Sequence, residues 1–138
     1  MKYKSILSLL FITLVSLPSY AQFDDRSQIT ANIKQLFEGM RKVDSTMLIP
    51  LFEPEATLES VFLNEEGETV SRPSEIAGFI TAVGQPREQV WDERIHNYDI
   101  NIDGPLAIAW TPYSFYVDDT LSHCGVNVFT FVKHGSKW

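Results

Sequence analysis

The spacing of hydrophobic residues changes once along the chain, near residue 89. Before that point apolar residues recur every three to four positions, which is typical of amphipathic helices. This pattern predicts a helix over Ser27–Val43, a short helix over Thr46–Phe52 that Asp44 or Ser45 can cap, and a third helix between Pro73 and Gly84. The apolar stripe of the first helix is formed by Ile29, Ile33, Leu36, Phe37 and Met40.

Strands are predicted where hydrophobic and polar residues alternate with period two. A hairpin of Ala56–Leu63 and Glu68–Ser71 precedes the third helix. Beyond residue 89 the alternation is sustained, and Asp103-Gly104 is a strong two-residue turn signal. It predicts three long antiparallel strands, over Gln89–Ile102, Leu106–Val117 and Leu121–Lys133. Helices followed by antiparallel strands make an α+β fold, with three N-terminal helical segments packed on the sheet.

The first 21 residues have the features of a secretory signal. Two lysines precede an apolar run over Ile6–Leu17, and Pro18-Ser19-Tyr20-Ala21 ends it in a small-x-small pattern. The run is too short for a membrane-spanning helix, which needs about 20 apolar residues. We therefore expect residues 1–21 to be a signal peptide. Residues 22–138 would be one exported domain, periplasmic or secreted and without membrane contact, beginning with a short leader over Gln22–Arg26.

Charge and cysteine content exclude several classes of function. Loss of Lys2 and Lys4 with the signal leaves nine basic and 18 acidic residues, a net charge of −9, which disfavours nucleic-acid binding. Cys124 is the only cysteine, so it is either a small buried thiol or the source of an intermolecular disulfide. The histidines lack metal-ligand spacing and no nucleotide-binding loop is present, so neither a metal nor a cofactor is predicted.

Several short motifs, in order, resemble those of a known superfamily. They are Asp44, Leu51-Phe52-x-x-x-Ala56-Thr57-Leu58-Glu59, Arg72-Pro73-x-x-Ile76, Phe129-x-Phe131 and Gly135-x-x-Trp138. This arrangement resembles the nuclear transport factor 2-like superfamily, also called SnoaL-like or ketosteroid-isomerase-like. The resemblance implies a cone with a central cavity, and the nearest subgroup looks like exported bacterial proteins of the lumazine-binding type. Such proteins continue with a full last strand after the Gly-x-x-Trp turn, so we expect this domain either to be truncated at its C-terminus or to lack an edge strand.

The resemblance also allows the steroid-isomerase mechanism to be tested residue by residue. Leu36, Ser60 and Asn127 stand where that branch has a tyrosine, a carboxylate base and a donor aspartate. A serine cannot abstract a carbon-bound proton and a leucine donates no hydrogen bond. The sequence therefore disfavours this mechanism and favours binding over turnover.

Counting back from two-residue turns predicts which strand residues share a face. A turn at Asp103-Gly104 pairs Trp91 with Tyr116, and a turn at Asp119-Thr120 pairs Tyr116 with His123. Asn127 matches a cavity position of the superfamily, so this face is taken as the cavity. It carries Trp91, Glu93, Ile95, Trp110, Tyr116, His123, Asn127 and Phe129. We expect it to bind a small, mostly apolar molecule, with Ser60 on the first strand and Arg72 at the mouth as further contacts.

Two alternatives remain open at this point. An acid–base enzyme of the cyclase, dehydratase or isomerase type would use His123 with Glu93 or Tyr116. A non-catalytic interaction domain would have a cavity filled by core side chains. The opposite face is a two-fold dimer surface in many relatives, so a homodimer is expected. That face would carry Arg94, His96, Tyr98, Thr111, Tyr113, Phe115, Cys124, Val126 and Val128.

Overall fold

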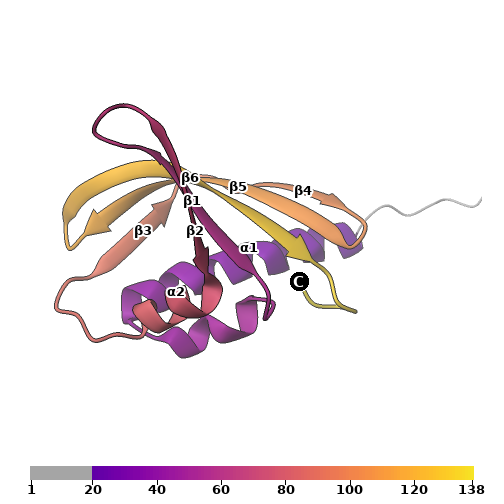
Figure 1. The fold of residues 1–138 in the computed structure, drawn as a ribbon. Helices are drawn as coiled ribbons and strands as arrows, with labels where there is room; N and C mark the ends of the chain where they lie inside the picture. The colour runs from indigo at the N-terminus through magenta and orange to yellow at the C-terminus, as the bar shows by residue number, and fades with distance from the viewer. Residues whose placement is uncertain (1–19) are drawn as a thin grey trace, which may run out of the picture.

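The computed structural model describes residues 20–138, in which helices cover one side of a curved antiparallel sheet (Figure 1). The predicted signal peptide lies outside the described residues apart from its last two positions. The chain is α+β, as the sequence predicts. Its helical elements are α1 (Tyr20–Lys42), the 3-10 turns η1 (Ser45–Met47) and η2 (Ile49–Leu51), and α2 (Ile76–Val83).

Six strands form two open sheets rather than a closed barrel. The hairpin of β1 and β2 stands by itself. In the larger sheet, β3 and β4 pair with successive halves of one edge of β5, and β6 pairs with its other edge. The strands are β1 (Thr57–Leu63), β2 (Thr69–Glu75), β3 (Trp91–Ile95), β4 (Asp99–Asp103), β5 (Leu106–Val117) and β6 (Thr120–Val132).

The core lies between α1 and the sheet. The five apolar residues predicted for one face of the first helix are all buried, with exposures of 9% or less. They pack in one cluster with Ile100 of β4 and with Ala107 and Ala109 of β5. Buried apolar area of this kind is the main source of stability in a domain without a disulfide.

Three helix predictions need correction. The third helix begins at Ile76 rather than at Pro73, which lies in β2 opposite Glu59. Residues 22–26 are not a separate leader, because α1 already includes them and Asp25 is buried. The helix predicted over Thr46–Phe52 is instead two 3-10 turns, since Pro50 lacks the amide hydrogen that a longer helix needs. The predicted cap is confirmed, because the Asp44 side chain accepts hydrogen bonds from the Thr46 amide at 3.0 Å and hydroxyl at 2.6 Å.

The register of the long strands also differs from the prediction. The strand expected over Gln89–Ile102 is interrupted after Ile95, and the following turn is centred on Gly104-Pro105, with Gly104 at φ +55°. Trp91 therefore pairs with Val117 rather than with Tyr116. A shift of one residue turns every side chain of β5 to the opposite face relative to β3. Thr111, Tyr113 and Phe115 consequently lie on the inner face, toward α1.

Candidate functional site

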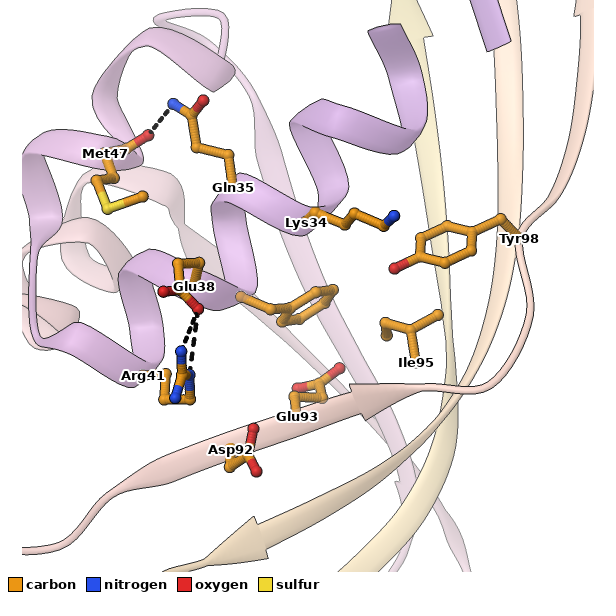
Figure 2. A pocket seen from close by; sticks show the side chains of 10 residues that line it. Lys34, Gln35, Glu38, Arg41, Met47, Asp92, Glu93, Ile95 and Tyr98 are labelled. Carbon is orange, nitrogen blue, oxygen red and sulfur yellow. Dashed lines mark hydrogen bonds and ion pairs between the residues drawn. The ribbon is translucent and has the colours of Figure 1, made fainter. Parts of the chain in front are cut away.

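A groove of about 520 Å³ lies between α1 and β3 (Figure 2). Its walls combine apolar side chains with a charged rim, and a single carboxylate on the inner face of the sheet, that of Glu93, also lines it. The apolar and aromatic lining consists of Phe37, Met47, Ile95 and Tyr98. Lys34, Gln35, Glu38, Arg41 and Asp92 complete it, with Glu38 and Arg41 joined in an ion pair at 2.6 Å.

Glu93 is the chemically distinctive residue of this groove. Burial raises the pKa of its carboxyl to about 7, although a hydrogen bond from Asn127 acts in the opposite direction. The Asn127 amide donates to Oε1 at 2.5 Å, and no residue in the described part of the chain donates to Oε2. Near neutral pH the carboxyl is therefore divided between its protonated and ionised forms. Such a group can donate a proton or hydrogen bond to a ligand, or accept one.

Tyr113 belongs to the same face, although its sequence position predicted the opposite one. Its Cα pairs with those of Ile95 and Gly125, and its ring lies over Gly125, where a Cβ would come within 2.6 Å of the hydroxyl oxygen. Burial raises the pKa of the Tyr113 hydroxyl, and the nearby Glu93 charge adds to this. Tyr113 thus remains a neutral hydroxyl near the carboxyl. The glycine opposite it is the sequence signal that could have indicated this packing.

His123 lies on the inner face but does not contact Glu93 in the structure. Phe115 is the Cα partner of both residues and stands between them. The imidazole packs against the Phe115 ring at 5.1 Å between centroids and edge-on to Tyr113 at 5.8 Å. Its Nδ1 is 3.1 Å from the Ser122 hydroxyl oxygen, and the residue is exposed. The predicted catalytic pairing of His123 with Glu93 is therefore not formed.

Two residues that were predicted to line the cavity lie on the outer face of the sheet instead. Trp110 and Tyr116 project from the outer side of β5, because of the register shift described above. Trp110 is 52% exposed, and the guanidinium of Arg94 lies over the Tyr116 ring at 3.9 Å. Neither of them can contact a molecule bound between α1 and the inner face of the sheet.

The remaining predicted contacts divide into core and hairpin positions. On the inner face, Trp91 is covered by Arg87, whose guanidinium is 4.0 Å from the ring centroid, and Phe129 packs edge-on against Phe37. Ser60 and Arg72 pair across the exposed β1–β2 hairpin and do not line the groove. Among the predicted positions, Glu93 and Ile95 therefore line the groove, and Asn127 is joined to Glu93 by a hydrogen bond.

Two further kinds of feature were looked for in the described part of the chain, a metal site and a membrane-spanning helix. Within residues 20–138, no three histidine, cysteine, aspartate or glutamate side chains cluster closely enough to hold a metal ion. The same part of the chain contains no helix with the length and hydrophobicity to span a membrane.

Comparisons with known proteins identify the fold. Protein-family models show no match to this sequence, and neither do curated proteins. A crystal structure from Shewanella baltica OS155, described as an NTF2-like protein of unknown function, superposes with a TM-score of 0.60. The two chains are 21% identical, and the match covers 88% of this chain and 90% of the other. The order of helices and strands, the curved open sheet and this superposition together show that the chain has the nuclear transport factor 2-like fold.

Proposed function

We propose that this domain binds a small, mostly apolar molecule in the groove between α1 and β3, and that Glu93 makes its main polar contact. The observation that carries the proposal is the carboxyl of Glu93, largely buried, lining an apolar groove with Oε2 unengaged by the described residues. Ligand sites are typically concave, mostly apolar, and equipped with a few well-placed polar groups. The volume of about 520 Å³ falls in the usual range for such sites.

The charges at the rim of the groove restrict the class of ligand that is expected. Arg41 is paired with Glu38, and the Lys34 ammonium lies 5.9 Å from the centroid of the Tyr98 ring (Figure 2). The rim thus holds both signs of charge, and the interior offers a carboxyl of pKa about 7 among aromatic and aliphatic groups. A neutral ring compound carrying one hydroxyl or carbonyl group fits this chemistry better than a polyanion does.

The proposal can be tested through the pH dependence of binding. A panel of aromatic and polyketide-like molecules would be screened by NMR with the chain from Gln22 to Trp138. For each binder we expect the Kd to change about tenfold between about pH 6 and pH 8, because the ligand bonds to one protonation state of Glu93. Glu93→Gln should make that Kd independent of pH. Tyr116→Phe, a matched control on the outer face, should leave the wild-type profile unchanged.

Two results would contradict binding at the groove. One is a set of shifts on ligand addition that maps to the outer face of β5 and β6. The other is a pH profile that Glu93→Gln leaves intact. If no molecule in the panel binds, the interaction-domain alternative gains support instead.

An acid–base enzyme is the second candidate, and the pKa of Glu93 favours it. A general base works best when its pKa is close to the working pH, and here that pKa is about 7. In this structure the proton would be handled by Glu93 beside Tyr113, since His123 and Tyr116 lie elsewhere. Turnover of a bound molecule that Glu93→Gln abolishes and His123→Ala preserves would distinguish this candidate from simple binding.

We further propose that the domain is exported by its N-terminal signal and forms a homodimer through the outer sheet face. Support for the dimer comes from large apolar side chains that are exposed side by side at one end of β5 and β6, because a contiguous apolar patch is unusual on the surface of a monomer. Sedimentation velocity at micromolar concentration tests it, and a monomer would contradict it. The exposed apolar side chains that would form the dimer contact are Leu106, Ile108, Trp110, Val128 and Val132.

A further inference from the structure

The charged side chains at the rim of the groove differ in whether a neighbouring charge neutralises them. The Glu38 carboxylate pairs with Arg41 at 2.6 Å, and the Asp92 carboxylate pairs with Arg94 at 2.7 Å. Lys34 lines the groove one helical turn before Glu38, and no carboxylate in the described part of the chain forms an ion pair with it. The rim therefore retains one positive charge that a ligand could neutralise.

The Lys34 ammonium lies beside a second hydrogen-bond donor, the hydroxyl group of Tyr98. Its Nζ atom is 5.9 Å from the centroid of the Tyr98 ring, and Figure 2 shows the ammonium and the phenol oxygen at the same end of the groove. Burial raises the pKa of the Tyr98 hydroxyl, so this group stays protonated and can donate. Neither side chain is hydrogen-bonded to another of the described residues. Two such donors, one of them charged, suit a carboxylate.

A second hollow of about 360 Å³ adjoins the groove, since Lys34 lines both. Arg26 also lines this hollow, and its Nη1 atom donates to the backbone carbonyl of Ile100 at 2.5 Å rather than to a carboxylate. Although acidic residues outnumber basic ones in the sequence, this end of the groove is therefore positively charged. Among the described residues, those lining the hollow include no acid: they are Arg26, Ser27, Thr30, Ala31 and Lys34.

We propose, on the basis of the binding function stated above, that the ligand is a ring compound with a short chain that ends in one carboxylate. Lys34 and Tyr98 bind this carboxylate and determine the specificity of the groove. The ring itself is neutral and contacts Phe37 and Ile95, and its hydroxyl or carbonyl group bonds to Glu93. The chain extends toward Lys34, whose single positive charge matches a single carboxylate.

The experiment compares two probes that differ in one group, para-hydroxyphenylbutyrate and its primary amide. At neutral pH the first is ionised and the second is uncharged. NMR titrations give the Kd of each probe for the chain from Gln22 to Trp138 and for its Lys34→Gln and Tyr98→Phe variants. Lys42→Gln is the matched control, because it removes the same charge from the same helix at a position that does not line the groove. Both lysines are exposed, so both variants should fold as wild type does.

We expect wild type and Lys42→Gln to bind the acid about tenfold more tightly than the amide, because a charge-assisted hydrogen bond is stronger than a neutral one. Lys34→Gln should bind the two probes equally, and Tyr98→Phe should reduce the preference to about threefold through the loss of one hydrogen bond. A preference for the acid that survives in Lys34→Gln would overturn the inference. So would a preference that Lys42→Gln also loses, since that indicates the net charge of the helix rather than a contact.

Two further results distinguish the specificity of the groove from its binding function. If the acid and the amide bind wild type equally, and both Kd values still follow the ionisation of Glu93, the carboxylate specificity is overturned and the binding function stands. If neither probe binds at millimolar concentration, the binding function loses its support and the carboxylate specificity is overturned with it.

Discussion

Two carboxylates at opposite ends of the core show how the partner of a buried acid decides its charge. Asp25 of α1 accepts hydrogen bonds from the Lys133 ammonium at 2.5 Å and the Trp138 indole at 2.9 Å. These contacts, the Lys133 bond first, lower the pKa of its carboxyl. Glu93 has a neutral amide as its hydrogen-bond partner, and burial raises its pKa to about 7. The ammonium beside Asp25 keeps that carboxylate ionised, so it acts as a structural ion pair. Glu93 has no cation beside it, so its carboxyl still holds a proton that it can release near pH 7.

The difference has opposite consequences for stability as a function of pH. Asp25 stabilises the fold when ionised, so its contribution is present above its ordinary pKa of 3.8 and is lost as the pH falls through the lower folded-state value. Glu93 is destabilising when ionised, so stability is lost as the pH rises from 4.5 to about 7. The Asp25 carboxylate beside the C-terminal turn therefore stays charged at neutral pH, whereas the Glu93 carboxyl in the groove changes its protonation state near pH 7.

The largest effect is expected from Glu93→Gln. The rise in pKa from 4.5 to about 7 corresponds to about 3 kcal/mol of lost stability above pH 7, because each pKa unit is worth about 1.4 kcal/mol. A glutamine is neutral and can still accept the Asn127 hydrogen bond. The free energy of unfolding at about pH 8 should therefore rise by up to about 3 kcal/mol, as measured by urea titration.

This gain should disappear at about pH 4, where wild-type Glu93 is protonated in both the folded and the unfolded chain. Exposed Glu88 offers the matched control, and Glu88→Gln should change stability little at either pH. A Glu93→Gln chain that is less stable than wild type at about pH 8 would show that the ionised carboxylate has a stabilising partner.

Asp25→Asn is expected to have the next largest effect, in the opposite direction. The amide leaves the Lys133 ammonium without its counter-charge at a half-buried position, so the Tm at neutral pH should fall by several degrees. The difference from wild type should shrink as the pH falls below the ordinary value of 3.8 and through the lower pKa of folded Asp25, because wild-type Asp25 then also loses its charge. Neighbouring Asp24 is exposed and bonds only to Gln28 among the contacts seen, so Asp24→Asn is the control. An equal loss in both variants would indicate a general effect on α1.

Asn127→Leu should produce the smallest change and test the comparison most directly. Its amide lowers the pKa of Glu93, so its removal should raise that pKa further and cost about 1 kcal/mol of stability for the lost hydrogen bond. An NMR titration of the Glu93 side-chain carboxyl measures the shift. Asn101 is an exposed asparagine on β4, and Asn101→Leu should leave the titration unchanged. A lower Glu93 pKa in Asn127→Leu would mean that another donor replaces the amide.

Local sequence patterns were sufficient for most of the elements and for the fold class. The stripe of apolar residues from Ile29 to Met40 predicted the buried face of α1, because helical periodicity and burial arise from the same geometry. The period-two alternation located the long strands for a similar reason. The order of motifs then indicated the nuclear transport factor 2-like fold, which the structural comparison confirms despite 21% identity.

The site was predicted only in part, because it depends on register. Glu93 and Asn127 were both assigned to the inner face, and both are there. Trp110 and Tyr116 were placed beside them by counting from turns at Asp103-Gly104 and Asp119-Thr120. In the structure the strand is interrupted after Ile95, so Trp91 pairs with Val117, and on the other edge of β5 His123 pairs with Phe115 rather than with Tyr116. One extra residue between strands reverses a face, and a pattern of alternation has the same period in either register.

The sequence by itself therefore determined the main helix α1, the long strands β5 and β6, the fold class, the charge balance and the single thiol. Tertiary structure decided which face of β5 meets α1, since packing against the helix favours the short side chains of Ala107 and Ala109 over Leu106 and Trp110. It also decided that Glu93 is desolvated beside an amide while Asp25 is paired with an ammonium. Desolvation and pairing depend on groups far apart in the sequence, so no local pattern of residues encodes them.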